Sequence, residues 1–572
     1  MKQILTLVLT GILLSAPVQS QTPKLYDVVI DELMADPAPQ VGLPNNEWIE
    51  LKNNSSTAFN LLGWRISDRT GQSGPMPNFI LKPDSFLIIC TGSAVAAMSA
   101  FGTTISVTSF PSLNNSGDLL SLRNAQGKLM HCVNYTDKWY QNELKAGGGW
   151  SLEMIDTHNP CSGISNWTAS RDTKGGTPGR KNSADAINAD QTLPRLLRAF
   201  AADSLNISLI FDEPLDSLNA LAVGNYRISD GIDAPLKADP VPPLFDHVNL
   251  SLGLPLLPDK IYTIMVNSVT DCSGNKIGAA NNAKFGLARR ADSLDLVINE
   301  VLFNPSPVCV DYVEIFNRSK KITDLKNIYI ANRNTAGVLS SITPLSSENY
   351  PFFPGEFMVV TSDAGAVKRN YITLNPGAFA EIGTMPSYNN DKGDVVLLNE
   401  QGNILDELQY NENWHFKLLD NHEGVALERI DYNAPTQSAD NWHSASASSG
   451  FGTPTYANSQ TRAGGEAAGE VKVSPEIISP DNDGHDDFAT IDYRFPTPGY
   501  VANITIFDVG GRPVRYLQRN ALCGIKGSYH WDGLGERNQA LPVGIYIIYT
   551  EVFNLDGKKK QFKEVIVLAK KN

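Results

Sequence analysis

The stretch VVIDELMADP at residues 28–37 decides the fold, because it returns as LVINEVLFNP at residues 296–305. In both stretches apolar residues surround one glutamate, Glu32 in the first and Glu300 in the second, and a proline ends the run. Short runs rich in β-branched residues that end at a turn residue are typical of β-strands. The recurrence predicts two copies of one strand-rich unit.

Further blocks follow in the same order in both copies. They pair NEWIELKN (46–53) with DYVEIFN (311–317), LKPDSFLIIC (81–90) with FFPGEFMVVT (352–361), SLNNSGDLLSLRNAQG (112–127) with SYNNDKGDVVLLNEQG (387–402), and WSLEMID (150–156) with VALERID (425–431). The loops differ in length and the blocks do not, which indicates duplication of a folded unit. Gly, Asn, Asp and Pro clusters separate the runs, and no segment has the stripe of an amphipathic helix. The sequence therefore predicts an all-β protein in which pairs of sheets pack as sandwiches.

Both copies resemble the lamin-tail domain, an immunoglobulin-like sandwich found in nuclear lamins and in many exported bacterial proteins. The resemblance rests on the IDE and INE of the opening strands, the EWIELKN and DYVEIFN strands, the GD before an apolar strand, and the closing NW and GTP. It covers residues 25–183 and 294–459. The second copy reads DLKNIYIAN where the first has an LGW strand. The resemblance implies tandem immunoglobulin-like β-sandwiches.

Two further segments also read as sandwiches. Residues 184–293 contain FDEPLD and VTDCSGN and resemble bacterial Ig-like domains. The last 100 residues contain SPDNDGHDDF, IFDVGGRP, WDG and PVGIY. They resemble the C-terminal domain of gliding-associated, type IX-secreted proteins, which serves as a sorting signal, and also the Ig-like domain of flagellar hook-cap proteins, which is structural. A stretch rich in Gly, Ala and Glu at 460–472 precedes them and is expected to be a flexible linker.

The N-terminus has the order of a secretory signal peptide. Lys2 precedes an apolar run from Ile4 to Leu14, and Val18 and Ser20 are the small residues before a cut ahead of Gln21. The run is shorter than the roughly 20 residues of a membrane-spanning helix, and no later segment is apolar enough to span. The expected division is 1–20 signal peptide, 21–183 lamin-tail-like domain, 184–293 Ig-like domain, 294–459 second lamin-tail-like domain, 460–472 linker, and 473–572 C-terminal sandwich. We expect a secreted protein, either extracellular or on the outer-membrane surface.

The net charge and the cysteine pattern argue against a nucleic-acid partner and against a structural zinc site. The net charge of −14 disfavours nucleic acid, whose binding depends on neutralised phosphates. The six cysteines form no CxxC or Cys/His cluster, so a structural zinc site is unsupported. An exported compartment permits disulfides. At most one bridge is expected, among Cys90, Cys132 and Cys161, with the remaining cysteines packed as small apolar groups.

An acidic loop is the candidate metal site. Asp481, Asp483 and Asp487 surround Gly484, and closely spaced carboxylates of this kind can bind Ca²⁺. The alternative is a polar turn whose Asp and Asn side chains start a strand. The sequence leaves both interpretations open, and Ca²⁺ is the only cofactor it suggests.

Glutamates recur at matched positions in the two copies. Glu32 and Glu50 correspond to Glu300 and Glu314. Paired carboxyls can perform acid–base catalysis, bind a ligand or metal, or hold strand ends and turns by hydrogen bonds. Their duplication favours the framework interpretation.

Aromatic residues recur in two matching loops. Trp139 and Tyr140 lie in TDKWYQNE, and Trp414 and His415 lie in NENWHFK. If exposed, these rings form a face on which sugars or peptides stack, and function concentrates in loops. The alternative is that each Trp packs over the end of its sandwich.

The sequence favours binding over catalysis. It contains no GxSxG, Walker, HExxH or dinucleotide fingerprint, and every segment is assigned to a sandwich, so we expect no enzyme. The predicted function is a secreted or cell-surface binding or scaffold protein that engages a glycan or protein at the cell envelope. The alternative is a non-catalytic accessory component of an exported hydrolase system, because lamin-tail-like modules often accompany secreted nucleases and phosphatases.

Overall fold

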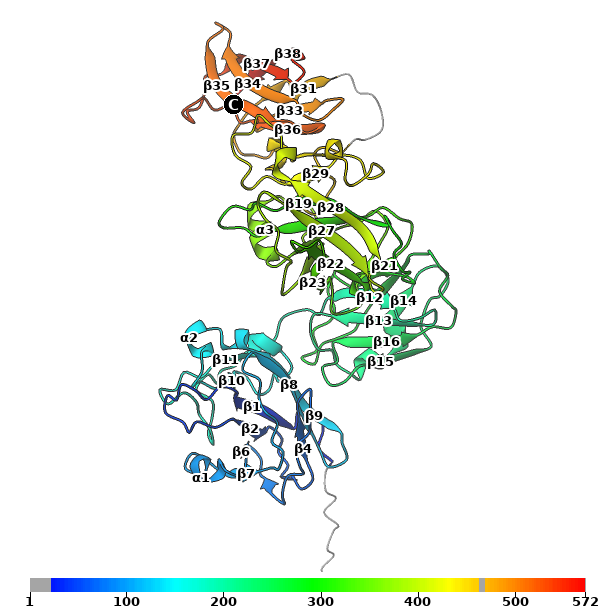
Figure 1. The fold of residues 1–572 in the computed structure, drawn as a ribbon. Coiled ribbons are helices and arrows are strands. Elements are labelled where there is room, and N and C mark those ends of the chain that lie inside the picture. Colours follow the sequence, from blue (N-terminus) through cyan, green and yellow to red (C-terminus); the bar gives the residue numbers. More distant parts are fainter. Residues whose placement is uncertain (1–21, 462–468, 571–572) are drawn as a thin grey trace, which may run out of the picture. The chain divides into compact units, whose positions relative to one another are not determined.

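The computed structural model describes residues 22–461 and 469–570, and within them the chain is all-β, as predicted (Figure 1). The predicted signal peptide lies outside the described residues. The chain divides into two compact units. The first contains Met1–Pro255 and Tyr262–Lys284, and the second contains Leu256–Ile261 and Phe285–Asn572. Each unit holds one of the two repeated segments and the pair of sheets that follows it in sequence.

The first repeated segment, called the first module (residues 22–186), is built on a six-stranded sheet. From edge to edge its strands are β11 (Trp167–Ala169), β10 (Leu152–Met154), β1 (Val28–Met34), β2 (Trp48–Asn53), β6 (Phe86–Cys90) and β7 (Thr104–Ser106). The remaining strands are β4 (Arg65–Ser67), β8 (Gly117–Arg123) and β9 (Leu129–Thr136) in one sheet and β3 (Phe59–Asn60) and β5 (Ile80–Leu81) in another. Two short helices, α1 (Val95–Met98) and α2 (Glu143–Ala146), lie in the connections.

The second repeated segment, called the second module (residues 291–461), repeats this sheet order. Its six-stranded sheet runs β30 (Trp442–Ser444), β29 (Leu427–Arg429), β19 (Leu296–Leu302), β20 (Tyr312–Asn317), β25 (Phe357–Thr361), β26 (Phe379–Glu381). Its other strands are β23 (Leu339–Pro344), β22 (Ile328–Arg333), β27 (Lys392–Asn399) and β28 (Ile404–Asn411) in one sheet and β21 (Thr323–Asp324) and β24 (Pro351–Phe352) in a second. The helix α3 (Ala364–Asn370) follows β25. Since β22 pairs with β27 as β4 pairs with β8, the divergent DLKNIYIAN segment keeps the position of the first copy's LGW strand.

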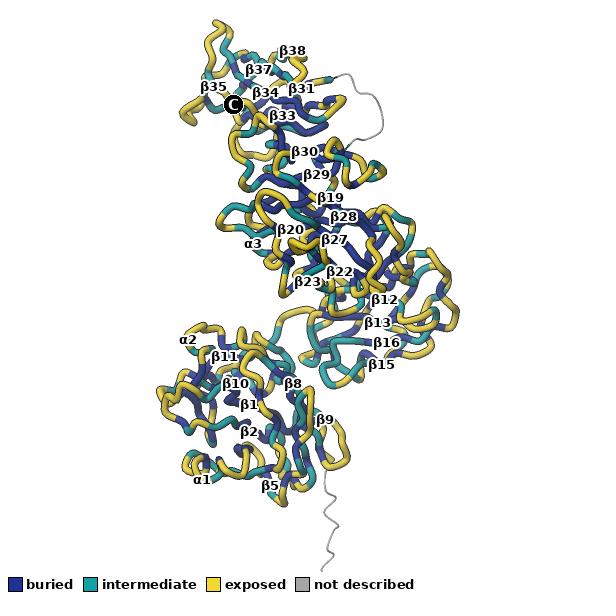
Figure 2. The backbone as a smooth tube through the Cα atoms, in the orientation of Figure 1, coloured by how far each residue is buried: buried dark blue, intermediate teal, exposed yellow. Residues whose placement is uncertain are grey.

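Each module buries one large core cluster together with smaller ones, and the buried strands are dark blue in Figure 2. In the first module Trp64 and Trp167 belong to that core, and in the second Trp442 takes the same place as Trp167. Strands β1 and β19 are buried at every position because both of their faces are covered. Their near-continuous apolar sequence, which opened the repeat, follows from that burial.

Both opening strands contain a β-bulge just before the glutamate, between Ile30 and Glu32 and between Ile298 and Glu300. The amide freed at the bulge donates to a buried side chain from the neighbouring sheet. Ile30 donates to Nδ1 of His131 at 3.0 Å, and Ile298 donates to a carboxylate oxygen of Asp406 at 2.9 Å. The bulge is therefore a shared feature whose acceptor has diverged.

The segment after the first module has two sheets. One runs β12 (Leu196–Ala201), β13 (Asn206–Phe211), β16 (His247–Ser251), β15 (Lys237–Pro240), and the other runs β14 (Tyr226–Ile228), β17 (Tyr262–Val266), β18 (Asn282–Phe285).

A disulfide joins Cys161 of the first module to Cys272 of this segment. The expectation of a bridge within the first module was therefore wrong. Residues 111 positions apart in sequence meet because loops from two sandwiches face each other, which sequence spacing does not reveal. Of the cysteines expected to pack as small apolar groups, Cys523 is buried, Cys309 is half-buried, and for Cys272 the expectation was wrong because it forms the disulfide. Cys90 is a buried free thiol.

The C-terminal segment has a three-stranded sheet, β31 (Glu470–Ser474), β33 (Ala489–Arg494), β36 (Lys526–Trp531). Its five-stranded sheet runs β32 (Ile477–Ile478), β38 (Lys559–Leu568), β37 (Gly544–Phe553), β34 (Val501–Asp508), β35 (Pro513–Leu522). Of the predicted linker at 460–472, Gln460 is buried and Glu470 to Lys472 belong to β31, while 462–468 lie outside the described residues. No helix in the described part of the chain is long and apolar enough to cross a membrane.

Candidate binding site

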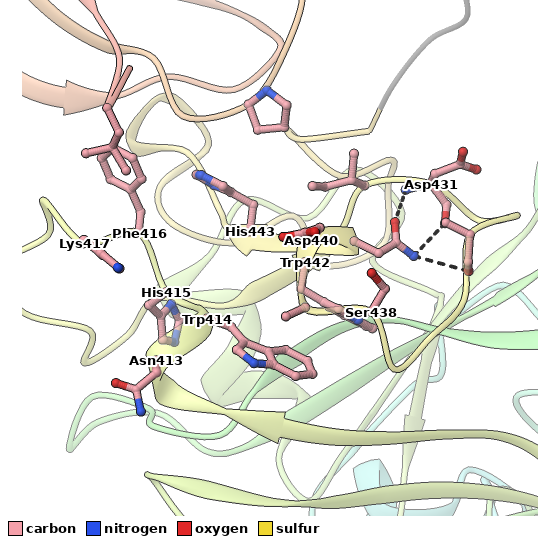
Figure 3. Close-up of a pocket in the computed structure, with 16 residues that line it drawn as sticks. Asn413, Trp414, His415, Phe416, Lys417, Asp431, Ser438, Asp440, Trp442 and His443 are labelled. Carbon is pink, nitrogen blue, oxygen red and sulfur yellow. Dashed lines mark hydrogen bonds between the residues drawn. The ribbon is translucent and has the colours of Figure 1, made fainter. Parts of the chain in front are cut away.

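The loop after β28 shapes a groove on the second module. The Asn411 side chain accepts a hydrogen bond of 2.9 Å from the amide of Asn413 and so caps a single 3₁₀ turn that ends at Trp414. Trp414 is half-buried, because one face packs against the module core. The groove encloses about 630 Å³. Its lining includes Asn413, Trp414, His415, Phe416, Lys417, Asp431, Ser438, Asp440, Asn441, Trp442 and His443 (Figure 3), with Pro498 and Leu555 from the C-terminal segment.

Of the two aromatic residues predicted here, only Trp414 offers a ring face. His415 is buried, and its Nδ1 lies 2.9 Å from the hydroxyl of Ser444. Its ring stacks on His422 with centroids 4.7 Å apart. Burial, and then the neighbouring His422 and His443, lower the pKa of His415 to about 3, so it is neutral at physiological pH. The prediction of His415 as an exposed stacking residue was wrong, because the turn that presents Trp414 directs the next side chain into the core.

The equivalent groove of the first module is smaller. Tyr140 is buried, so its prediction as an exposed ring was also wrong, and Trp139 is half-buried with its ring 6.0 Å from that of Trp167. The groove encloses about 250 Å³. Glu213, Pro214 and Leu244 of the following segment line its other side.

The same tryptophan pair therefore marks a groove in both modules. Trp139 and Trp167 occupy the positions of Trp414 and Trp442. The second member of each pair was visible in the sequence only as the repeated NW dipeptide. That repeated dipeptide was the signal that could have linked it to the groove.

The acidic loop brings its three carboxylates together. One oxygen atom from each of Asp481, Asp483 and Asp487 lies within 4.8 Å of the others. The same side chains also accept amide hydrogen bonds from the loop itself, with Asp487 accepting from Asn482 at 2.7 Å and from Gly484 at 2.9 Å. The loop thus has the contacts of the polar-turn interpretation and the converging oxygens that Ca²⁺ prefers.

A second acidic group was missed in the sequence because its members are far apart in the chain. Asp190, Glu213 and Asp271 each place one carboxylate oxygen within 4.8 Å of the others, close to the Cys161–Cys272 disulfide. Burial, followed by the charges of Asp190 and Asp271, raises the pKa of Glu213 to about 8. Only the folding of two separate strand pairs against each other brings these acids together.

The duplicated glutamates belong to the framework. Glu32 and Glu300 accept amide hydrogen bonds from Thr177 at 2.7 Å and from Thr453 at 2.9 Å, and Glu50 accepts from Gly179. This confirms the interpretation that they hold turns. A third glutamate of each module, Glu153 and Glu428, and the residues that follow each GTP were not predicted as part of this framework. Their equivalence, TPxxxNS in both copies, was the available signal.

Comparison with known proteins identifies one family. Residues 21–137 match the Lamin Tail Domain family. No curated protein matches the sequence.

Comparison with solved structures gives matches to parts of the chain. They include the N-terminal part of the bacterial S-layer protein SbsC (16% identity, 29% of this chain and 40% of that chain, TM-score 0.16). A DUF4876 family protein from Bacteroides thetaiotaomicron matches with 13% identity, 42% and 87% coverage, and a TM-score of 0.17. Latent PorU from Porphyromonas gingivalis matches with 9% identity, 79% and 40% coverage, and a TM-score of 0.15. The match thus spans 40% of the SbsC fragment.

Proposed function

We propose that the mature chain is an exported surface protein that binds a polymer and does not catalyse a reaction. The observation that supports this most is the groove of about 630 Å³ at Trp414 in the second module, which recurs in smaller form at the equivalent position of the first. A pocket that combines an aromatic floor with a few polar groups is the usual form of a ligand site.

The chemistry of the groove favours a glycan. The half-buried Trp414 offers an indole face to the C–H groups of a sugar ring. Around it, Asn413, Lys417 and Asp440 are exposed and provide an amide, an ammonium and a carboxylate for sugar hydroxyls. The neutral His443 ring adds a further hydrogen-bonding edge, since burial lowers its pKa. We assign the principal site to the second module, because its groove is more than twice as large.

A glycan array with the mature chain tests this proposal. We expect selective binding, and we expect the double variant Asn413→Ala with Asp440→Ala to weaken it at least tenfold. The matched control is Lys138→Ala with Ser165→Ala, which changes the equivalent positions of the first module and should leave binding unchanged. Absence of binding to every glycan and extracted envelope polysaccharide, or equal loss in both variants, contradicts the proposal.

Export completes the proposed function. The signal-peptide order and the sorting-type sequence of residues 473–572 together support delivery to the cell surface or medium. We expect that deletion of residues 473–572 retains the protein inside the cell envelope. Unchanged appearance of the truncated protein in the medium would assign the C-terminal segment a structural role instead.

A further inference from the structure

The last stretch of each module crosses over a row of buried glutamates. The crossing stretches, called the closing segments, are TPGRKNSA (177–184) and TPTYANSQ (453–460). Beneath them, neighbouring strands place the row in register. The glutamates of the row are Glu32, Glu50 and Glu153 in the first module and Glu300, Glu314 and Glu428 in the second, all with 0% exposure.

Backbone amides of the closing segment satisfy one oxygen of each glutamate. In the second module Thr453 donates to Glu300 at 2.9 Å, Thr455 donates to Glu314, and Gln460 donates to Glu428 at 2.9 Å. The first module repeats the pattern from Thr177, Gly179 and Ala184. The row of carboxyls is therefore the surface to which each closing segment is attached.

A threonine hydroxyl bridges two of the carboxyls in each module. Oγ1 of Thr453 lies 2.6 Å from Oε2 of Glu300 and 2.8 Å from Oε1 of Glu428. A hydroxyl carries one proton and can donate to only one of these oxygens. If both carboxyls were ionised, the second contact would set a buried negative charge against an oxygen lone pair, which is strongly unfavourable. If one carboxyl is protonated, it donates to the threonine oxygen and both contacts are hydrogen bonds.

The first module has the same bridge. Oγ1 of Thr177 lies 3.2 Å from Oε2 of Glu32 and 2.8 Å from Oε1 of Glu153. The remaining oxygens of both glutamates are also engaged: Ser151 donates to Glu32 at 2.6 Å, and Ser183 donates to Glu153 at 2.8 Å. Two modules of diverged sequence have thus kept one hydroxyl between two buried acids.

We propose that each module holds one buried proton at its Glu–Thr–Glu bridge, between Glu32 and Glu153 in the first and between Glu300 and Glu428 in the second, and that this proton fastens the closing segment to the sheet. The proton is taken up from solvent on folding. Its release leaves two carboxylates that share one hydroxyl, and the closing segment then loses one of its attachments.

The charged groups around the second bridge oppose ionisation. Glu300, Glu314 and Glu428 face one another from β19, β20 and β29, so their negative charges repel one another. The phenol of Tyr312 acts in the opposite direction, because it donates to Glu300 and stabilises the ionised form. The phenol of Tyr456 faces the same row from the closing segment. Burial, and then the charge of Glu300, raise the pKa of Glu428 to about 8.

The first bridge has more varied neighbours. Glu50 on β2 and Asp31 on β1 add negative charge. The ammonium of Lys145 on α2 faces Glu153 and acts in the opposite direction, and that of Lys52 on β2 offsets the charge of Asp31. Burial, and then Glu153, raise the pKa of Glu32 well above its usual value. A raised pKa agrees with the hydrogen bonds at Thr177, where one hydroxyl proton contacts two carboxyls.

In the second module the fastened segment also holds the C-terminal segment. The carbonyl of Ser459 accepts a hydrogen bond of 2.9 Å from the amide of Ile525, and the hydroxyl of Ser459 donates to Glu428 at 2.8 Å. Gln460 donates from its backbone to Glu428 and from its side chain to the carbonyl of Cys523 at 3.4 Å. Loss of the proton therefore loosens the contact with the C-terminal segment as well. This inference does not depend on the proposed ligand.

Hydrogen exchange of the full mature chain tests the proposal. Protection of the peptide that covers 453–460, corrected for intrinsic exchange, is measured from pH 6.5 to 9. For wild type we expect protection to fall by up to tenfold per pH unit until pH exceeds the pKa of the folded state. Glu300→Gln keeps a donor for the Thr453 oxygen but has no proton to lose, so its protection should stay level. Glu423→Gln, at an exposed position, should behave as wild type.

Infrared spectroscopy provides a second test that does not depend on hydrogen exchange. We expect the carbonyl stretch of protonated, buried carboxyls at pH 7 and its loss at higher pH, and the band should be weaker in Glu300→Gln and Glu32→Gln. Protection that is constant or rises with pH in wild type, a Gln variant that follows wild type, or no protonated carboxyl band at pH 7 would each overturn the proposal.

Discussion

At the scale of single residues, the two modules use different side chains to accept the amide that the β-bulge frees. The bulge in each opening strand frees an amide that needs a buried acceptor. His131 accepts it in the first module, and Asp406 accepts it in the second, where the buried guanidinium of Arg429 pairs with that carboxylate at 2.9 Å. A neutral imidazole needs no counter-charge, whereas a buried carboxylate does.

The His131 acceptor predicts an acid sensitivity of the first module. Burial lowers the pKa of His131 to about 4, below the value of about 6.5 of an unfolded histidine. The stabilisation is therefore complete above pH 6.5 and is lost as pH falls toward 4. His131→Asn keeps an acceptor for the Ile30 amide and does not titrate. The difference in melting temperature between wild type and this variant should change between pH 6.5 and 4, and a difference that is independent of pH contradicts the assignment.

The Asp481 loop predicts a calcium response, which we propose for the C-terminal segment. At free Ca²⁺ one hundred times its dissociation constant, binding adds about 2.7 kcal/mol to the free energy of unfolding. We expect the melting transition of this segment in the full chain to rise with Ca²⁺, and to rise less with Mg²⁺, which prefers a tight octahedron. Asp481→Asn with Asp483→Asn should abolish the response, and the exposed control Asp556→Asn should keep it. A melting temperature that changes with neither Ca²⁺ nor chelator contradicts the calcium site and leaves the polar turn as the explanation.

At the scale of elements, the repeated blocks predicted most of the sheets. Each matched block is a strand or a strand with its turn, and the two six-stranded sheets have the same order. The pattern was readable because strands buried on both faces are continuous apolar runs. The helix α3 was not predicted, because its seven residues are too few for a periodic stripe and its main signal is one capping residue, Asp363, whose side chain accepts the Ala366 amide at 2.8 Å.

The candidate site was predicted only in part. Trp139 and Trp414 lie at grooves, whereas their neighbours Tyr140 and His415 point into cores, because adjacent residues of a turn face in different directions. The acid Glu428 lies far from Glu300 in sequence and meets it only through strand register. The repeated sequence pattern therefore located the loops, whereas tertiary packing determined which of their side chains face the grooves.

The Cys161–Cys272 disulfide links the first module to the segment that follows it, and this link can be tested. Non-reducing peptide mapping should recover Cys161 bonded to Cys272, with Cys90 and Cys523 as thiols that resist labelling in the native state, since burial raises the pKa of Cys90 to about 11. Because the bridge closes a loop of about 100 residues, Cys272→Ser should lower the free energy of unfolding by up to about 4–5 kcal/mol. Recovery of Cys272 as a free thiol contradicts the assignment.

At the scale of the whole molecule, each compact unit pairs one module with the sheets that follow it. In both units the tryptophan groove is lined on one side by that following segment, through Pro214 and Leu244 in the first and Pro498 and Leu555 in the second. The following segment thus forms one wall of each groove. The surrounding acidic chain, with a net charge of −14, favours a neutral or basic ligand over an anionic one.

Export makes a direct prediction about the mature protein. Cleavage after Ser20 leaves Gln21, or its cyclised form, as the first residue. Mass spectrometry of protein recovered from the medium or the cell surface should find that terminus. A chain that still carries Lys2 at the cell surface contradicts the signal-peptide interpretation.

The proposal that this protein binds a glycan at the Trp414 groove is tested most directly by a hydrogen-exchange footprint. The mature chain is compared with and without the glycan that binds best on the array. We predict slower exchange in the peptides that cover residues 412–417 and 438–443, and no change in the matching 137–142 and 163–168 of the first module. Protection confined to any other part of the chain, or the same protection in the Asn413→Ala and Asp440→Ala double variant, would contradict it.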